Sequence, residues 1–272
     1  MRVLVTGAGG YMGQHVLREL DKYNVDILGT DIKDFDAASN VEKIIGDIFT
    51  DDFKNKLEVD VLIHLVWQDN FNHKSINHLK NISKHYEFIS SIIENGCKNI
   101  NAMGTMHEVG YYEGAITEFT PCNPLSLYGI AKNSVRQSLL MLNNEKIHVK
   151  WLRAFYITGD DERNNSIFAK ILQMEREGQK TFPFNSGKNK YDFIDVNELA
   201  LMIVKASLQT EVTGIINCCS GKPVPLKEKV ESFIKENNLK ILPQYGAFPD
   251  RPYDSPAIWG DNKKILEILR KN

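Results

Sequence analysis

Tyr128 and Lys132 stand four residues apart in the segment Tyr128-Gly129-Ile130-Ala131-Lys132. On a helix, two side chains with this spacing lie on one face. A free tyrosine has a pKa of about 10, which is too high for a base at neutral pH, but a neighbouring ammonium favours the phenolate. We therefore expect Lys132 to supply the first of two positive charges that lower the pKa of Tyr128, so that this phenol can exchange a proton with a substrate hydroxyl.

A glycine-rich segment at the start of the chain, Gly7 to Gly13, follows the apolar run Arg2-Val3-Leu4-Val5-Thr6. A strand that ends in such a turn and opens a helix makes an anion site, because the first N–H groups of the helix point at a phosphate. The first glycine allows the turn, the second lets a pyrophosphate approach, and the third lets helix and strand pack closely. The predicted cofactor-binding residues here are Gly7, Gly10, Tyr11, Met12 and Gly13.

Asp31 ends the second predicted strand, about 20 residues after the glycine turn. A carboxylate at this place accepts hydrogen bonds from adenosine ribose hydroxyls and repels a 2′-phosphate, which favours NAD over NADP. Lys33 is close enough to weaken that preference, so NADP stays open. The plainer alternative makes Asp31 a turn or helix-capping residue.

Short β-branched runs alternate with helical patterns through the first two-thirds of the chain. This alternation predicts an α/β fold, a doubly wound parallel sheet of the Rossmann type with helices on both faces. The predicted strands are Val3–Thr6, Val25–Thr30, Lys43–Ile45, Val59–Leu65, Lys98–Ala102, Val149–Phe155 and Gly214–Cys219. The predicted helices are Tyr11–Tyr23, Asp51–Leu57, Ile76–Asn95, Ser126–Asn143 and Asn197–Gln209.

The regular alternation ends after Phe155. We expect residues 1–158 plus about 192–220 to form the dinucleotide-binding domain, and about 159–191 plus 221–272 to form a small C-terminal substrate lobe. A cleft between the two would lie at the carboxyl ends of the strands, where open α/β sheets bind their ligands.

The composition limits the possible partners. The chain has 272 residues, 42% of them hydrophobic, and a formal net charge of −2, which gives no electrostatic reason to expect nucleic acid or an anionic membrane. No apolar run approaches a ~20-residue membrane span, and no signal peptide precedes the first strand. The four cysteines show no metal spacing, so we expect a cytoplasmic protein with reduced cysteines and no metal.

The glycine turn together with the Tyr-Lys pair resembles the extended short-chain dehydrogenase/reductase family, also called the NAD-dependent epimerase/dehydratase family, which modifies nucleotide sugars. Asn123-Pro124-Leu125-Ser126-Leu127, just before Tyr128, resembles the Pro-x-Ser that precedes the family's catalytic tyrosine. Gly104-Thr105-Met106-His107-Glu108-Val109-Gly110 resembles its Ser/Thr segment. The resemblance implies that Thr105, Tyr128 and Lys132 are catalytic, although Thr105 could instead only cap a helical turn.

The same resemblance extends the cofactor site. It implies that Asp47 and Ile48, in Gly46-Asp47-Ile48, hold the adenine ring, and that the backbone of Leu65 and Val66 lines the cofactor. Phe155, Tyr128 and Lys132 complete the predicted cofactor contacts. We expect His64 to be a packed core histidine and not a catalyst.

For the substrate, the resemblance implies that Met106 and His107 lie over the sugar. Family members that eliminate water read Thr-Asp-Glu where this chain reads Thr105-Met106-His107, so dehydration is not expected, and we expect Glu108 to face elsewhere. His107 is interpreted as a hydrogen-bonding residue, with a second acid/base as the alternative.

Three further substrate residues come from later motifs. Arg251 begins a segment that resembles the C-terminal signature of nucleotide-sugar 4-epimerases, which implies that it binds the substrate diphosphate; a surface salt bridge is the alternative. Tyr191 replaces an arginine of the family pattern, for which Lys188 or Lys190 could compensate, and Tyr156 replaces an asparagine.

The chain looks most like the short nucleotide-sugar 4-ketoreductases, such as those that form dTDP-6-deoxy-talose or dTDP-fucose. The resemblance implies NAD(P)-dependent, reversible hydride transfer at C4 of a dTDP- or GDP-linked 4-keto-6-deoxyhexose. The alternatives are a 4-epimerase with tightly bound NAD and, from another class, a non-catalytic dinucleotide-sensing regulator. The family resemblance also implies a homodimer, in which the helices Ile76–Asn95 and Ser126–Asn143 pair with their copies.

Overall fold

The computed structural model describes residues 1–50, 57–69, 72–159, 166–250 and 254–271. Its main feature is a sheet of seven strands in the order β11-β7-β5-β4-β1-β2-β3. All neighbouring strands in it run parallel. The strands are β1 (Arg2–Thr6), β2 (Asp26–Asp31), β3 (Val41–Ile45), β4 (Val61–His64), β5 (Asn99–Thr105), β7 (His148–Ala154) and β11 (Gly214–Cys218).

The strand order reverses at β1, which lies between β2 and β4. In register, Val5 of β1 stands beside Gly29 on one side and Ile63 on the other. The chain crosses to opposite sides of β1 when it continues to β2 and later to β4, so the loops that follow these strands diverge at their carboxyl ends. This topological switch point is where doubly wound sheets bind their ligands.

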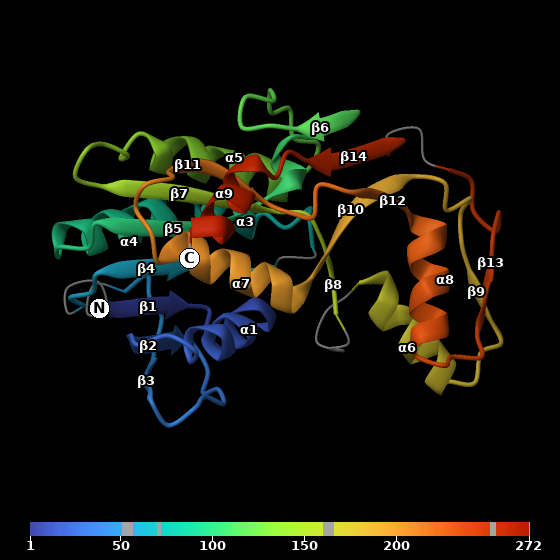
Figure 1. The fold of residues 1–272 in the computed structure, drawn as a ribbon, viewed down its shortest axis with the longest axis horizontal. Helices are drawn as coiled ribbons and strands as arrows, with labels where there is room; N and C mark the ends of the chain where they lie inside the picture. Colours follow the sequence, from blue (N-terminus) through green and yellow to red (C-terminus); the bar gives the residue numbers. More distant parts are fainter. Residues whose placement is uncertain (51–56, 70–71, 160–165, 251–253, 272) are drawn as a thin grey trace.

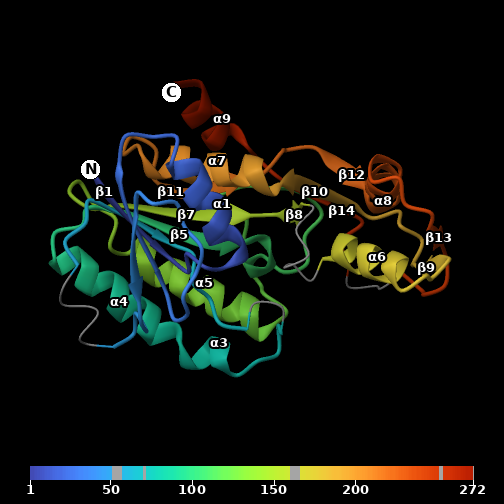
Figure 2. The same cartoon turned by 90° about the horizontal axis from the view of Figure 1, so that it is seen from below.

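Helices cover both faces of the sheet (Figures 1 and 2). On one face lie α1, α7 and α9, and on the other lie α3, α4 and α5. Their bounds are α1 (Tyr11–Leu20), α3 (Asn77–Lys80), α4 (Ile82–Glu94), α5 (Leu127–Leu140), α7 (Val196–Ser207) and α9 (Lys263–Lys271). Each face buries its own apolar cluster, and the doubly wound α/β fold predicted from the sequence is confirmed.

A second, smaller group of elements lies beyond one end of the large sheet, on the right of Figure 1. It contains a mixed sheet in which β12, β10, β14 and β6 are neighbours and β8 also pairs with β10, together with the two-stranded sheet β13-β9 and two helices. Its elements are β6 (Gly114–Ile116), β8 (Tyr156–Thr158), α6 (Ile167–Arg176), β9 (Thr181–Pro183), β10 (Lys190–Asp195), β12 (Pro223–Pro225), α8 (Leu226–Glu236), β13 (Leu242–Gln244) and β14 (Ala257–Gly260).

The buried carboxylate of Asp192 on β10 joins three segments of this smaller group. It accepts hydrogen bonds from the backbone N–H groups of Ser220, Gly221 and Gly260, at 2.9, 2.9 and 3.1 Å, and from the Ser220 hydroxyl. A buried charge is tolerated when donors surround it in this way. Asp192 therefore fixes the turn after β11 and the end of β14 to β10.

One predicted helix is divided in the structure. The segment 76–95 is divided into α3 and α4 at Asn81, whose side-chain amide donates to Gln68 at 3.0 Å. The predicted helix Asp51–Leu57 lies almost entirely outside the described residues. Among the helices within the described residues, none combines the length and the apolar composition that a bilayer span demands.

The last helix, α9, returns to the large sheet. Its side chains Ile265 and Ile268, spaced for one helix face, are buried in the apolar cluster shared with α1 and α7. Strand β10 bridges the two groups, since its first half pairs with β12 and β14 and its second half with β8. The division at residues 158, 192 and 220 stays a prediction.

Candidate active site

The glycine turn after β1 has the geometry of an anion site. Gly7 adopts φ +72°, and a Cβ there would lie 2.9 Å from the backbone N of Val66; a Cβ at Gly13 would lie 2.1 Å from the Gly7 carbonyl oxygen. These two positions therefore require glycine. At Gly10, which caps α1, the only described atom within 4 Å of a Cβ would be that same oxygen, at 3.2 Å. The start of α1 thus keeps open space for a ligand phosphate.

Carboxylates follow the next two strands at the same edge of the sheet. Asp31, at the end of β2, accepts the Gly9 N–H at 3.0 Å and the Ile32 N–H at 2.8 Å. Asp47, after β3, accepts the Phe49 N–H at 2.9 Å. A carboxylate has about four acceptor positions, so both keep capacity for ligand hydroxyl or amino groups.

The remaining predicted cofactor residues lie around the same edge. Leu65 and Val66 directly follow β4, and the Leu65 N–H donates to the Thr6 carbonyl at 3.2 Å. Ile48 and Phe155 are buried, in different apolar clusters. The structure thus brings the predicted residues of three loops to the switch point, and the open cradle at Gly10 fits a dinucleotide.

Thr105 and Tyr128 come together although they lie on separate elements. Thr105 ends β5, and its side chain lies close enough to the Tyr128 phenol, in the first turn of α5, to lower the pKa of that phenol. This turn is fixed by Ser126, whose hydroxyl oxygen accepts the Gly129 N–H at 3.1 Å. The alternative role of Thr105 is present as well, because its Oγ1 accepts the His107 N–H at 3.3 Å.

Lys132 is buried one turn after Tyr128. Its Nζ donates to the Met103 carbonyl at 2.7 Å and lies 3.9 Å from the centre of the Trp67 ring. Burial lowers the pKa of Lys132 to about 7. Near neutral pH this amine is therefore divided between its charged and neutral forms.

In the protein alone, Lys132 does not lower the pKa of Tyr128; the predicted lowering relies on the cationic nicotinamide ring as well and stays a prediction. Burial raises the pKa of Tyr128 to about 12, and the hydrogen bond from Thr105 offsets only part of this shift. The physical reason is that the same low-dielectric surroundings disfavour both the phenolate and the ammonium that would stabilise it. A phenolate here requires a further positive charge at the site.

Four rings surround Tyr128, and we call them the aromatic cage. His73 stacks on it with centroids 4.9 Å apart and an interplanar angle of 15°. His78, Trp67 and His107 meet it edge-on, at 5.3, 6.1 and 6.2 Å. The cage explains why burial dominates the pKa of this phenol.

Sequence reasoning did not identify Trp67, His73 or His78. They lie in or beside the loop after β4, which carries no regular pattern. The available signal was compositional, since four ring-bearing residues of the kinds that line polar sites, including His85, fall between positions 67 and 85. His64 is a core histidine as predicted, because its ring bonds to Thr6 and His85 at 2.9 Å each, and burial lowers its pKa to about 3.

Met106, His107 and Glu108 form the short helical turn η1 after β5. Met106 is buried in the apolar cluster of the smaller group, whereas the His107 side chain keeps an exposed face. Crowding by protein atoms and by His73 lowers the pKa of His107 to about 4, so the ring is neutral at pH 7.

Glu108 faces away from the site, as expected. Its buried carboxylate accepts Trp151 Nε1–H at 2.7 Å and forms an ion pair with Arg153 at 2.7 Å, while Arg136 lies 3.5 Å away. Both Trp151 and Arg153 are on β7. The turn that carries Met106 and His107 is therefore anchored to the neighbouring strand.

The two positions that depart from the family pattern lie against each other. The rings of Tyr156 and Tyr191 are 4.4 Å apart, and Tyr156 lies 6.4 Å from His107. Burial raises the pKa of Tyr156, so its hydroxyl stays protonated. Met106, His107, Tyr156 and Tyr191 thus lie on the side of Tyr128 where the substrate is predicted. Arg251 lies outside the described residues.

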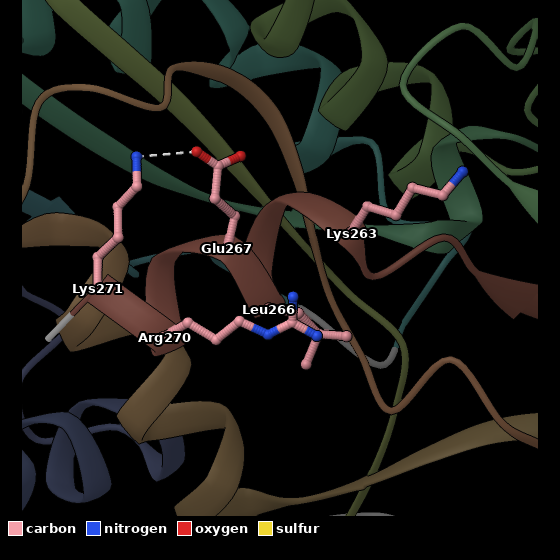
Figure 3. A pocket seen from close by; sticks show the side chains of 5 residues that line it. All are labelled: Lys263, Leu266, Glu267, Arg270 and Lys271. Carbon is pink, nitrogen blue, oxygen red and sulfur yellow. Dashed lines mark ion pairs between the residues drawn. The ribbon is translucent and has the colours of Figure 1, made fainter.

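A surface hollow elsewhere has a different character. It is lined by one face of α9, with Lys263, Leu266, Glu267, Arg270 and Lys271 around it (Figure 3). Lys271 pairs with Glu267 within it at 2.9 Å. None of these residues belongs to the predicted site.

Comparison with known proteins identifies the family and supports the assignment of the fold. A family model described as the NAD dependent epimerase/dehydratase family matches residues 3–219. A dTDP-6-deoxy-L-talose 4-dehydrogenase (NAD(+)) from Aggregatibacter actinomycetemcomitans is 47% identical over 269 residues, which cover 96% of this chain and 99% of that protein. A Bacillus subtilis protein described as an uncharacterized UDP-glucose epimerase is 22% identical and covers 99% of this chain and 92% of its own length.

Solved structures share the fold. MoeE5 in complex with UDP-glucuronic acid and NAD superimposes with a TM-score of 0.85 at 20% identity, covering 99% of this chain and 93% of that one. A UDP-glucose-4-epimerase from Stenotrophomonas maltophila, with bound NAD and formylated UDP-arabinopyranose, gives a TM-score of 0.87 at 18% identity, covering 99% and 92%.

Proposed function

Because the chain belongs to the NAD dependent epimerase/dehydratase family, we propose that it is an NAD-dependent nucleotide-sugar oxidoreductase acting at C4 of a dTDP-linked 6-deoxyhexose. The observation that carries the proposal is that Thr105 and Tyr128 lie side by side, with Lys132 one turn away, at the edge of the sheet where β5 ends. The relative with 47% identity is named for this chemistry. A GDP-linked sugar is the alternative substrate.

The cofactor residues have distinct tasks. The open start of α1 at Gly10 would hold the pyrophosphate, and Asp31 would accept hydrogen bonds from the adenosine ribose. Asp47 and Ile48 would hold the adenine ring. Bound NAD supplies hydride transfer at its nicotinamide ring.

The protein's own residues handle the proton. Tyr128 would donate to the C4 oxygen during reduction and accept the proton from the C4 hydroxyl during oxidation. Thr105, which lies beside Tyr128, would orient that oxygen. Lys132 would hold the cofactor ribose and supply positive charge once protonated.

The substrate's position follows from the residues beside Tyr128. Met106, His107, Tyr156 and Tyr191 would contact the sugar, and Arg251 would bind the diphosphate through its planar pair of donors. Aromatic and thioether surfaces suit the apolar C6 methyl of a 6-deoxy sugar.

The decisive experiment incubates the purified protein with dTDP-6-deoxy-L-talose and NAD⁺ and follows NADH absorbance. We expect NADH to form in proportion to the sugar oxidised. Turnover of the sugar without net NADH would identify a 4-epimerase. Binding of NAD with no turnover of dTDP- or GDP-linked sugars would instead indicate the dinucleotide-sensing regulator.

We further propose a cytoplasmic homodimer. The cysteines within the described residues are free thiols, which suits a reducing compartment. Exposed apolar side chains on α3 and α5, among them Leu79 and Ile130, offer a surface for pairing through the helices α4 and α5.

A further inference from the structure

The histidines near the site fall into two groups. The rings of His64 and His85 bond to each other, and His78 accepts Trp67 Nε1–H at 3.1 Å while its other nitrogen bonds to the Asn72 carbonyl at 2.9 Å. By contrast, the rings of His73 and His107 make no side-chain hydrogen bond to any residue that the structure describes. Their nitrogens are free for a ligand.

These two rings face each other beside Tyr128. Their centroids are 4.9 Å apart with an interplanar angle of 67°, and His73 also stacks on the phenol. They come from different elements, His73 from the loop before α3 and His107 from η1. His73 is half-buried and His107 keeps an exposed face, so a ligand can reach both.

The backbone fixes both rings relative to the catalytic residues. The His73 carbonyl accepts the Tyr128 N–H at 3.2 Å, and the His107 N–H donates to Thr105 Oγ1 at 3.3 Å. Both imidazoles are therefore held beside the place where Thr105 and Tyr128 would bind the C4 oxygen of a sugar.

Both imidazoles are neutral at pH 7. Burial, with His78 as the nearby charge, lowers the pKa of His73, and burial together with His73 lowers that of His107. A neutral imidazole has one donor and one acceptor nitrogen. Two of them can therefore give a single hydroxyl both a donor and an acceptor.

We propose that His73 and His107 together bind the C3 hydroxyl of the sugar and make the enzyme selective for substrates that carry it. In a 6-deoxyhexopyranose, C4 has two ring neighbours, and of these C5 bears the methyl group while C3 bears a hydroxyl. The inference rests on the proposed function. A substrate without this hydroxyl would leave two desolvated imidazoles unpaired, which is the strongest form of discrimination available to a polar site.

The test is a cycle that combines a residue change with a substrate change. His73→Phe keeps a ring to stack on Tyr128 but removes both nitrogens. Binding of a dTDP-6-deoxyhexose and of its 3-deoxy analogue is measured by calorimetry with NADH present, so that the sugar is not oxidised during the titration. We expect the wild type to bind the analogue roughly 10-fold more weakly, and the variant to bind the two about equally, since one hydrogen bond is typically worth about one such factor.

A matched control is His148→Phe, at the start of β7 and outside the site, which should leave the discrimination at its wild-type value. NAD affinity should be unchanged in all proteins. Because both rings bind one hydroxyl, His107→Phe should cause the same loss of discrimination between the two sugars. The double variant should lose no more discrimination than either single variant. If His73→Phe fails to fold, the His107→Phe variant decides the matter.

Full discrimination retained in His73→Phe, or additive losses in the double variant, would overturn the pairing. The proposed function fails separately, by the absence of NADH formation with a wild type that still binds and discriminates the sugars. A wild type that binds neither sugar would overturn both.

Discussion

At the scale of single residues, Tyr128 is placed where a proton-transfer residue is predicted, but its pKa is too high for a base at neutral pH. Tyr128 lies against Thr105 and one turn from Lys132, yet burial holds its pKa near 12. Lowering it to 7 would require about 7 kcal/mol of differential stabilisation, at 1.36 kcal/mol for each unit. The enzyme is therefore poised to act as a base only when positive charge is close to the phenol.

Tyr128→Phe removes the hydroxyl and keeps the ring within the cage. Folding and NAD binding should survive, whereas turnover should fall by ~10²-fold or more, because general acid–base catalysis contributes at least that factor. Tyr23→Phe, at the turn after α1, serves as the control. Steady-state kinetics decide the matter, and wild-type turnover in the Tyr128 variant would remove this residue from the mechanism.

Asp31→Asn tests the choice of cofactor. The amide oxygen can still accept the Gly9 N–H, but the charge that repels a 2′-phosphate is gone. We expect the preference for NADH over NADPH to narrow by roughly 10-fold, as for the loss of a single charged contact. Asp34→Asn, an exposed change nearby, should leave the preference as it is; a wild type that already prefers NADPH would show that Lys33 dominates.

The sequence predicts much of this site because its spacing is local. Gly7 and Gly13 belong to a turn whose backbone geometry dictates the residue type, and Thr105 and Tyr128 belong to short motifs that the family resemblance identifies. His73 lacks such a constraint, since it reaches Tyr128 only through a loop whose path depends on tertiary contacts. Pairings between loops of this kind have no signature in the sequence.

At the scale of elements, a single side chain can divide a helix. Residues 76–95 have helical spacing, but Asn81 bonds to Gln68 in the preceding loop and the chain restarts as α4. Asparagine competes for local hydrogen bonds in this way more readily than other residues. The periodicity predicts the helical content, and the long-range contact determines the break.

Ile130→Glu tests the proposed pairing of helices. Ile130 is exposed on α5, and a charge there would be buried if α4 and α5 pack against their copies. We expect the wild type to sediment with twice the mass of the chain at micromolar concentration, and the variant with the mass of one chain. Leu242→Glu, exposed on β13 in the other part of the molecule, should remain a dimer. A monomeric wild type would contradict the prediction.

At the scale of the whole molecule, a buried lysine makes stability depend on pH. Lys150 of β7 is fully buried, and its Nζ donates to Asn99 Oδ1 at 2.5 Å. Burial lowers the pKa of Lys150 to about 7, whereas an unfolded lysine titrates near ~10.4. Between these two pKa values the unfolded chain binds more protons than the folded chain, so the stability of the fold rises with pH. Below about pH 7 the full cost of burying the charged lysine remains.

Lys150→Met should remove this contribution. We expect the variant to gain less stability than the wild type between pH 7 and pH 9, by up to roughly 1.4 kcal/mol for each pH unit. Part of the slope remains, because the pKa of Lys132 is lowered in the same sense. Urea unfolding at several pH values measures the slopes, and Lys146→Met, on the turn before β7, is the control. Equal slopes in variant and wild type would refute the assignment.

The smaller group of elements was the least predictable part of the fold. Its strands are short, and β6 and β14 pair across more than half of the chain. Residues 263–271, which are predicted as part of the lobe with no helix there, form α9, and this helix packs against α7. Contacts between distant segments decide such placements.

Because β6 pairs with β14, it has no partner strand during a long part of the synthesis of the chain. A ribosome adds roughly 5–20 residues per second, so Gly114–Ile116 emerges several seconds before Ala257–Gly260, the only strand that pairs with it among the described residues. The carbonyl of Ile116 accepts hydrogen bonds from the side chain of Asn217 and from the N–H of Asp261, and both donors are synthesised later than Ile116. During this interval the first strands of the large sheet can already pair, while β6 presents an open edge, the feature that invites association between nascent chains. A message cut short before β14 would therefore yield a formed nucleotide-binding half with an unpaired strand, a natural client for chaperones.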